Sequence, residues 1–355
     1  MMLPRAFLAL LTFACARVVV AADSTMTYPA PPGPGNGRHL VFLTGDEEYR
    51  SEEGLPMLAK ILSQRHGFRC TVLFPLDADG TINPDNNTSI PGIEALDTAD
   101  GIVMLLRFRQ WPDRAMKHFA DAVTRGVPMV ALRTSTHAFR FPPNRPGSYS
   151  RFNDFGRNVL GENWVSHWGA NRRGATRGII EPGAGDDPIL RGVADVFGDS
   201  GVYETHPAPG SKILLRGQVL RGMSPTDEPD RDQRKKRKAD GQEQPINDPM
   251  MPIAWTRMDQ LENGKTRRVF CTTMGAATDL GNEAFRRLVL NAVLWSGGLD
   301  VPEKTDVRFV DPYAPGNYAF KGFRRGLRPS DHALGRVLPA GQPVPPSPPR
   351  AAKKR

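Results

Sequence analysis

The fold of this protein is decided by residues 39–74, which read HLVFLTGDEEYRSEEGLPMLAKILSQRHGFRCTVLF. Residues 39–43 form a continuous apolar run, which predicts a fully buried strand. Residues 56–66 have apolar side chains at helical spacing, with a proline at their start and a glycine just after their end. Residues 70–74 predict a second strand. A strand, a helix and a strand in this order predict parallel strands joined by a right-handed crossover.

The same alternation continues along the chain. Residues 101–106 and 127–132 predict further buried strands, and residues 112–125 predict the helix between them. Other strand-like runs occur at 178–181, 201–205, 213–219, 252–257 and 268–273, and an amphipathic helix at 283–294. This order predicts an α/β, flavodoxin-like fold with a mostly parallel sheet, helices on both faces and long loop insertions.

The two ends of the chain differ in composition from its centre. A short positive start, an apolar run over residues 6–16 and small residues before Asp23 predict a signal peptide, and hence export to the periplasm or the extracellular space. A lipoprotein signal using Cys15 is the weaker alternative. We expect a signal peptide at 1–22, a linker at 23–37, an α/β domain at 38–300, a C-terminal extension packing on it at 301–334 and a disordered Pro-rich basic tail at 335–355.

Cysteine content and charge limit the partners of the protein. Cys70 and Cys271 remain after the signal peptide, both inside apolar strand-like runs that favour buried thiols, although export would permit a disulfide. The formal net charge is +9, and much of it lies at residues 231–238 (RDQRKKRK) and in the last five residues. Neither basic run has interleaved aromatic residues, so we expect no nucleic-acid partner. A solvated loop, or contact with an anionic surface, remains as the explanation of residues 231–238.

Polar residues follow the first predicted strand. In an open parallel sheet, ligands bind outside the carboxyl ends of the strands. Asp46, Glu47, Tyr49 and Arg50 are therefore candidate ligand-binding residues. An acid of this loop can serve as a general base or accept hydrogen bonds from sugar hydroxyls. The alternative is a solvated loop with one acid near a helix N-terminus.

A second polar run follows the strand at residues 127–132. His137 is our candidate general acid/base, because imidazole exchanges protons near neutral pH. Arg133 and Thr136 are candidate ligand-binding residues, since a guanidinium can hold a carboxylate, a phosphate or a developing oxyanion. Ser135 lacks the G-x-S-x-G surroundings of a nucleophile elbow. A structural polar turn is the alternative.

Two more segments carry candidate ligand-binding residues. His167 and Trp168 lie side by side in an aromatic, loop-rich region, where they would suit the wall of a sugar pocket or an ordinary packing cluster. Thr273 and Met274 follow the last strong strand, among small residues that let the backbone approach a ligand. An ordinary strand-to-helix turn explains that segment equally well.

Glu204 and His206 complete the candidate catalytic set with His137. In an extended segment they point to the same side, so they can form an acid/base pair or supply two metal ligands. The histidines and carboxylates are scattered along the chain and lack a compact metal-binding signature. We therefore predict no cofactor, with a divalent metal as the weaker alternative.

Taken together, these segments resemble the secreted branch of the ThuA-like (trehalose utilisation) family, from about residue 39 to about residue 334. The resemblance rests on FLTGDEEYRSEE, ALRTSTHAF, FGRNVLGENWVSHWG, DDPILRGV, YETHP, LLRGQVLRGM, PMMPIAWTR, VFCTTMGAATDLGNEAFRRLVLNAVLWSGGL and FKGFRRGLRPSDHAL. It implies a fold similar to class I glutamine amidotransferases and a link to the metabolism of sugars or oxidised (keto-) sugars. One departure concerns His167-Trp168-Gly169, since His-His-Gly is common there in the family, which weakens a metal site in this segment.

The resemblance does not extend to glutaminase chemistry. Amidotransferases of this fold place a nucleophilic cysteine on the sharp turn where this chain has Arg133, and both remaining cysteines fall within strands. We therefore expect an exported enzyme that acts on a carbohydrate or keto-sugar by His/carboxylate acid-base chemistry. A non-catalytic sugar-binding module and a metal-dependent hydrolase are the alternatives. The reaction class, the substrate and the oligomeric state are left open.

Overall fold

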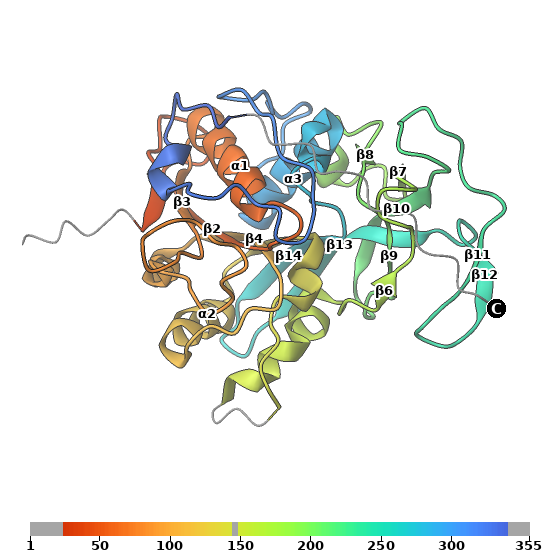
Figure 1. The fold of residues 1–355 in the computed structure, drawn as a ribbon, viewed down its shortest axis with the longest axis horizontal. Coiled ribbons are helices and arrows are strands. Elements are labelled where there is room, and N and C mark those ends of the chain that lie inside the picture. The colour runs from red at the N-terminus through yellow and green to blue at the C-terminus, as the bar shows by residue number, and fades with distance from the viewer. Residues whose placement is uncertain (1–23, 144–147, 340–355) are drawn as a thin grey trace, which may run out of the picture.

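The computed structural model describes residues 24–143 and 148–339. The expected signal peptide and residues 340–355 of the expected tail lie outside the described residues. Figure 1 shows a mixed α/β body with a mainly β-stranded part beside it. No helix among the described residues is long and apolar enough to cross a membrane.

A ten-stranded sheet forms the centre of the molecule. Its strands, in spatial order, are β1 (Thr25–Tyr28), β3 (Arg69–Leu73), β2 (His39–Gly45), β4 (Gly101–Leu106), β5 (Met129–Leu132), β14 (Thr266–Thr272), β13 (Met251–Gln260), β10 (Lys212–Val219), β7 (Thr176–Ile180) and β8 (Phe197–Gly198). The run from β3 to β14 is parallel, whereas β1 and the strands from β13 onward pair antiparallel. The predicted α/β fold with a parallel central sheet is therefore confirmed.

Short elements connect these strands. The remaining strands are β6 (Ser166–His167), β9 (Tyr203–Glu204), β11 (Arg234–Lys236) and β12 (Glu243–Pro245). The short helices are η1 (Ile93–Thr98), η2 (Arg133–His137), η3 (Ser148–Asp154), η4 (Gly156–Leu160), η5 (Pro188–Leu190), η6 (Asp279–Gly281) and η7 (Pro329–His332).

The long helices agree with the sequence pattern except at one end. Helices α2 (Asp113–Arg125) and α3 (Glu283–Ser296) lie where the apolar spacing predicts them. Helix α1 (Ser51–His66) begins five residues before the expected start at Pro56, which lies inside the helix. The difference arises because residues 51–55 are fully covered by other segments, so burial extends the helix beyond the amphipathic pattern.

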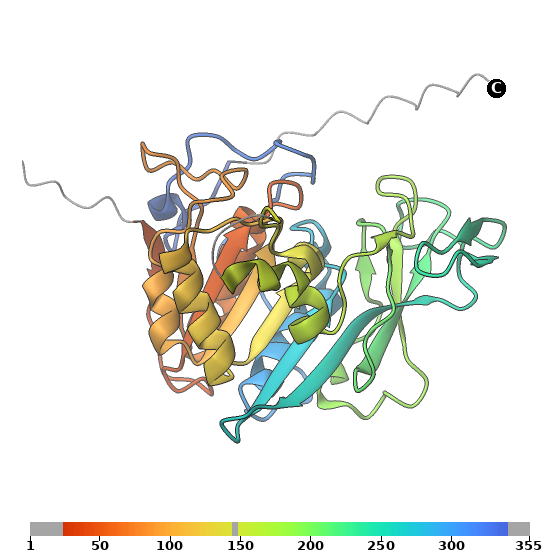
Figure 2. The same ribbon diagram turned by 90° about the horizontal axis from the view of Figure 1, so that it is seen from below.

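Alternation along the central strands divides the core between the two faces of the sheet. Leu40 and Phe42 pack with residues of α1 and α3, whereas Val41 and Leu43 pack with residues of α2. Successive side chains of a strand point to opposite faces, so both faces of a buried parallel strand must be apolar. Figure 2 shows the helices on the two sides of the sheet, as the sequence predicts.

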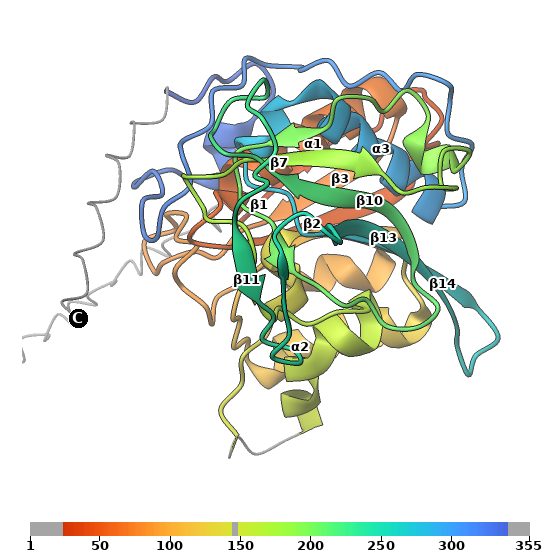
Figure 3. The same ribbon diagram turned by 90° about the vertical axis from the view of Figure 1, so that its right-hand side faces the viewer.

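Two segments outside the expected pattern also form strands. Within residues 23–37, which the sequence suggests to be a linker, β1 pairs with β3 and extends the sheet by one edge strand. The basic run at 231–238 contributes β11, which pairs with β12 in a hairpin beside the long strands β10 and β13 (Figure 3). Neither segment has the apolar pattern of a strand, because edge strands bury few side chains.

The C-terminal extension lies against α1 and across the end of the sheet where the parallel strands finish (Figure 2). Lys60 of α1 donates to Asp311 at 2.5 Å, and Glu53 accepts a hydrogen bond from the backbone of Gly316. The extension also reaches the loop after β2, where the backbone N–H of Ala319 donates to the carbonyl of Glu48. This loop is therefore covered by a segment distant in sequence.

Both described cysteines are free thiols. Cys70 lies on β3 and Cys271 on β14, and both are fully buried. Strands β2, β4 and β5 separate β3 from β14, so the two sulfur atoms are too far apart for a disulfide.

Candidate functional site

The backbone is strained at the carboxyl ends of neighbouring parallel strands. Phe108, two residues beyond β4, has φ 51°, and Arg133, the first residue after β5, has φ 40°. Arg50, in the loop between β2 and α1, has φ 58°. Left-handed conformations are costly for bulky residues and persist where the surroundings impose them, often at functional sites. This edge of the sheet is therefore the candidate ligand-binding or catalytic site.

Arg133 is a fully buried organising residue at this edge. Its guanidinium donates to the carbonyls of Gly201 and Thr273, to the hydroxyl of Tyr49 and to the side chain of Asn171. It also lies 4.1 Å from the ring centroid of Tyr49. Because four partners already engage its donors, Arg133 holds loops together, and of its nitrogens only Nε is buried without a partner.

The loop after β2 is also held by its own contacts. Asp46 accepts hydrogen bonds from the backbone N–H groups of Glu48 and Tyr49, and from the hydroxyl of Thr134. These bonds fix the turn and join it to the segment after β5. Asp46 is fully buried, so its carboxylate positions the loop instead of facing a ligand.

The other residues predicted in this loop take separate roles. Glu47 forms an ion pair with Arg107 and lies 3.7 Å from Arg109. The guanidinium of Arg50 donates to the backbone carbonyls of Glu47 and Glu48 in its own loop and to that of Ala319 in the C-terminal extension. Among the predicted residues of this loop, Glu47 has the largest exposed fraction, 8%.

Glu48 is the acid of this loop that can exchange a proton at neutral pH. Burial raises the pKa of its carboxyl group to about 7, and the charge of Asp46 adds to this effect. Arg133 and Arg107 oppose the shift but do not cancel it. No ion pair of Glu48 occurs among the described residues. A carboxyl group that is half protonated near pH 7 is suited to general acid/base catalysis.

His137 lies in a cluster of aromatic rings, which we call the His137 cluster: His137, Phe108, Trp164, His167 and Tyr203. The ring centroid of His137 lies 4.9 Å from Phe108, 5.3 Å from Trp164 and 6.4 Å from Tyr203. The ring of His167 completes the group, 5.2 Å from Tyr203. Phe108 and His137 come from the segments that follow β4 and β5, Trp164 comes from the loop just before β6, and His167 and Tyr203 come from the paired short strands β6 and β9.

The electrostatic surroundings keep both histidines of the cluster neutral. Burial lowers the pKa of His137 well below its ordinary value, and the charges of Arg107 and Arg133 lower it further. Desolvation by the neighbouring rings and the charge of Arg133 likewise lower the pKa of His167 to about 4, although part of its side chain is exposed. A neutral imidazole can accept a proton and can also hydrogen-bond to a hydroxyl or carbonyl group. Arg133 links the cluster to the loop of Glu48, because its guanidinium also lies 4.5 Å from the ring of Tyr203.

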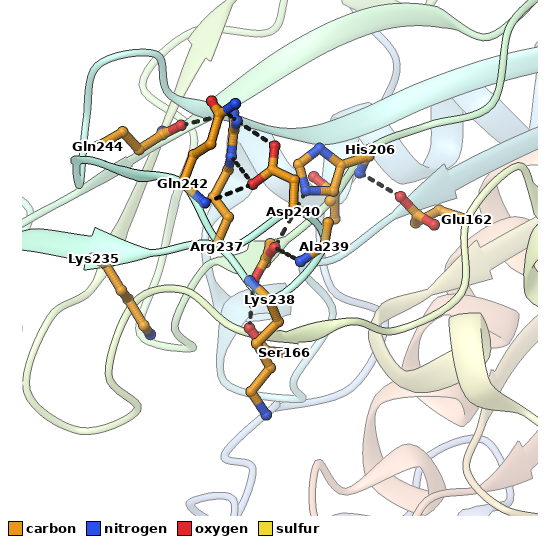
Figure 4. A network of polar contacts seen from close by, with 12 residues as sticks. Glu162, Ser166, His206, Lys235, Arg237, Lys238, Ala239, Asp240, Gln242 and Gln244 are labelled. Atoms are coloured by element: carbon orange, nitrogen blue, oxygen red, sulfur yellow. Dashed lines mark hydrogen bonds and ion pairs between the residues drawn. The ribbon is translucent and has the colours of Figure 1, made fainter.

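Glu204 and His206 contact each other, as expected, but not the His137 cluster. Glu204 follows Tyr203 on β9, so its side chain leaves the opposite face of the strand. The carboxylate of Glu204 holds the basic hairpin, because it accepts from the hydroxyl of Ser166 and from the backbone N–H groups of Lys238 and Ala239. Figure 4 shows these three donor residues close to His206. His206 lies 3.3 Å from the same carboxylate. The structure therefore separates two candidate catalytic residues from the third.

The remaining predicted ligand-binding residues form hydrogen bonds with other groups of the protein. Trp168 is fully buried, and its ring N–H donates to the carbonyl of Ile246. The side chain of Arg133 donates to the backbone carbonyl of Thr273, and its backbone N–H donates to the carbonyl of Met274. Thr136 lies 3.3 Å from the ring nitrogen Nδ1 of His137. Of these four residues, only Thr136 contacts the His137 cluster directly.

Sequence reasoning missed Glu48, Arg107, Phe108, Trp164 and Tyr203 as individual site residues. Trp164 and Tyr203 lie inside segments that the sequence singled out, so the aromatic content of those segments was a usable signal. Phe108 and Arg107 carry no such signal, since they follow an ordinary strand. Among the described residues, no three His, Cys, Asp or Glu side chains are grouped closely enough to hold a metal ion.

A pH-dependent stability is expected from Glu52, next to this loop. Both of its carboxylate oxygens are buried without a hydrogen-bond partner, and burial, with Glu53, raises its pKa to about 8. An unfolded glutamate loses its proton near pH 4.5. The native state thus binds the extra proton between these values, and the free energy of unfolding must fall as pH rises, by up to roughly 1.4 kcal/mol per pH unit.

Glu52→Gln tests this expectation. Urea unfolding between pH 6.5 and 8, above the ordinary titration of histidine, is the measurement. We expect the variant to lose part of the decline and to be more stable than the wild type at pH 8. Glu303→Gln, at a carboxylate that is 90% exposed, is the control and should keep the wild-type slope. An unchanged slope in Glu52→Gln would contradict the assignment.

Solved structures of low sequence identity match this chain. No family model and no curated protein matches the sequence. A solved structure described as a putative ThuA-like protein from Parabacteroides merdae matches with a TM-score of 0.45 and 12% identity, covering 75% of this chain and 92% of that one. A second, from Bacteroides uniformis, has a TM-score of 0.37 and 14% identity, covering 76% and 95%. The chain is similar in structure to ThuA-like proteins.

A structure of PurLQS from Thermotoga maritima also matches, with a TM-score of 0.36 and 10% identity, covering 73% of this chain and 99% of that one. Such matches describe the arrangement of helices and strands and leave the chemistry to the residues of the site.

Proposed function

We propose that this protein is exported and acts on a carbohydrate or keto-sugar by acid-base chemistry in the His137 cluster. The observation that carries the proposal is the meeting of a neutral imidazole with aromatic rings, in a cluster that Arg133 joins to the loop of Glu48, an acid whose pKa is raised to about 7. Aromatic faces pack against the apolar faces of sugar rings, while the neutral imidazole and the acid exchange protons with hydroxyl or carbonyl groups.

The roles follow from the contacts. Glu48 exchanges the proton, and His137 accepts or donates a hydrogen bond at the reacting oxygen. Tyr203 and Trp164 supply the faces against which a sugar ring packs. Arg133 is a positioning residue, since its donors are engaged by protein groups.

We also propose that the protein has no glutaminase activity. The strained turn after β5, where amidotransferases of similar fold place their nucleophilic cysteine, holds Arg133. The two described thiols lie inside strands, and burial raises the pKa of each well above its ordinary value. Neither supplies a thiolate for attack.

A non-catalytic sugar-binding module is the second candidate. It is favoured by the predominance of aromatic rings in the His137 cluster, none of whose five members carries a carboxylate. Such a module would use the same rings and hydrogen-bonding groups without turnover.

The test is incubation of the full chain with neutral disaccharides and their keto derivatives, followed by NMR for both binding and products. We expect product from the wild type, and roughly 100-fold slower turnover in His137→Asn with an unchanged unfolding midpoint. His118→Asn, at a half-buried histidine of α2, is the matched control. Binding without product favours the module, and neither binding nor product from any sugar would overturn the proposal.

A further inference from the structure

A hollow of about 280 Å³ borders the His137 cluster on the side of β4. It is lined by Glu47, Asp85, Asn87, Arg107, Phe108, Arg109, Gln110 and Arg140. Phe108 belongs to both: its ring is part of the lining, and its centroid lies 4.9 Å from that of His137. The volume lies just below the range of about 300–1,000 Å³ for small-molecule sites.

The hollow has an excess of positive charge. Glu47 is shared between Arg107 and Arg109, so one carboxylate faces two guanidinium groups. Asp85 is neutralised by Lys321, at 3.3 Å. Arg140 is exposed and forms no ion pair within the described part of the chain. Three arginines thus line the hollow with two carboxylates, and Lys321, which is outside the lining, neutralises one of these. This balance leaves positive charge for an anionic group to neutralise.

The cations are held in place by an aromatic ring and by the backbone. The guanidinium carbons of Arg107 and Arg140 lie 4.7 Å and 5.1 Å from the ring centroid of Phe108. The backbone N–H of Phe108 donates to the carbonyl of His137, and that of Arg140 donates to the carbonyl of Arg109. These bonds join the loop after β4 to the loop after β5. The position of the imidazole relative to the hollow is therefore fixed by the backbone.

An exposed ring extends this surface outward. Phe320, from the C-terminal extension, is 61% exposed, and the guanidinium of Arg107 lies 5.0 Å from its centroid. Arg107 therefore approaches both Phe320 and Phe108. Guanidinium groups beside aromatic rings offer a planar, weakly hydrated donor set for carboxylate or phosphate oxygens.

We infer that the ligand of this site carries an oxyanion, a carboxylate or a phosphate, which binds at Arg140 and Arg107 while its sugar ring reaches the His137 cluster. The inference deepens the proposed function, on which it rests, by naming the ligand class as acidic sugars: sugar acids or sugar phosphates. Arg140 supplies the unpaired charge, and Arg107, partly neutralised by Glu47, supplies further donors.

The test is calorimetric titration of the full chain with glucose, glucuronate, glucose 6-phosphate and inorganic phosphate. We expect at least one acidic sugar to bind more tightly than glucose, and more weakly as the salt concentration rises. Arg140→Gln should raise the dissociation constant of that acidic sugar about tenfold or more and leave that of glucose unchanged. The control is Arg151→Gln, an exposed arginine that lies 5.5 Å from the ring of Phe152 and outside the hollow.

The outcomes separate the two proposals. Glucose binding that matches the acidic sugars, with no effect of Arg140→Gln, overturns the oxyanion inference and leaves the proposed function standing. Binding of inorganic phosphate that Arg140→Gln weakens, without binding of any sugar, supports the oxyanion site and counts against the proposed function. A preference for glucuronate over glucose 6-phosphate identifies the carboxylate source, and the reverse identifies the phosphate. No binding of any anion overturns the inference.

Discussion

Arg133→Met is expected to lower the free energy of unfolding by roughly 3–5 kcal/mol, the range for breaking a buried, hydrogen-bonded charge network. The substitution keeps most of the side-chain volume but removes all donors. The carbonyls of Gly201 and Thr273 and the hydroxyl of Tyr49 then lose a buried partner. Unsatisfied buried polar groups carry the full cost of desolvation, which is why the effect is large.

Urea unfolding followed by circular dichroism measures this effect. The matched control is Arg325→Met, since Arg325 also lies beside an aromatic ring, 4.7 Å from Phe323, but is exposed. We expect the control to change stability by about 0.5 kcal/mol or less. Arg133→Lys keeps the charge without the fork of donors, so it should fall between the wild type and Arg133→Met. Arg133→Met within about 1 kcal/mol of the wild type would refute the organising role.

Glu48→Gln is expected to lower turnover of the sugar substrate by roughly 10²–10⁴-fold, the usual contribution of a general acid or base. The amide keeps the shape and hydrogen-bonding capacity of the side chain but cannot exchange a proton. The pKa of about 7 also predicts a limb near pH 7 in the pH–rate profile of the wild type. That limb should be absent from the profile of the variant.

The same substitution at another buried carboxylate is the control. Glu204→Gln replaces an acid that holds the basic hairpin on the opposite face of β9, so turnover and the limb near pH 7 should persist. Thermal unfolding checks that both variants are folded. A wild-type rate in Glu48→Gln, or a limb that survives there, would remove Glu48 from the mechanism. Loss of turnover only in Glu204→Gln would show that the catalytic site lies at the hairpin and not at the His137 cluster.

The sequence was informative about elements with strong apolar periodicity. The β-α-β unit, both faces of the parallel strands and helices α2 and α3 follow from it, because burial on both faces of a strand requires continuous apolar residues. It was less informative about α1, whose first residues are polar or small yet buried. Strand β1 and the hairpin of β11 and β12 were missed for the related reason that edge strands need no apolar pattern.

The candidate site divides in the same way. The rule that ligands bind at the carboxyl ends of parallel strands selected the loops of Asp46 and His137, and the structure joins these loops through Thr134 and Arg133. The grouping of His137 with Glu204 did not hold, because alternation along β9 turns Tyr203 toward the imidazole and Glu204 away from it. A two-residue strand gives too little sequence pattern to assign its faces.

By itself, the sequence determined the sheet, its parallel centre and the edge at which a ligand can bind, since these depend on short-range patterns of burial and on strand order. Only the tertiary structure decided which side chains meet there. Glu48 has a pKa near neutrality because distant segments cover it, and Glu47 is engaged by Arg107 and Arg109, while Arg140 has no ion pair among the described residues. Burial and charge balance are sums over residues far apart in the chain, which no local pattern records.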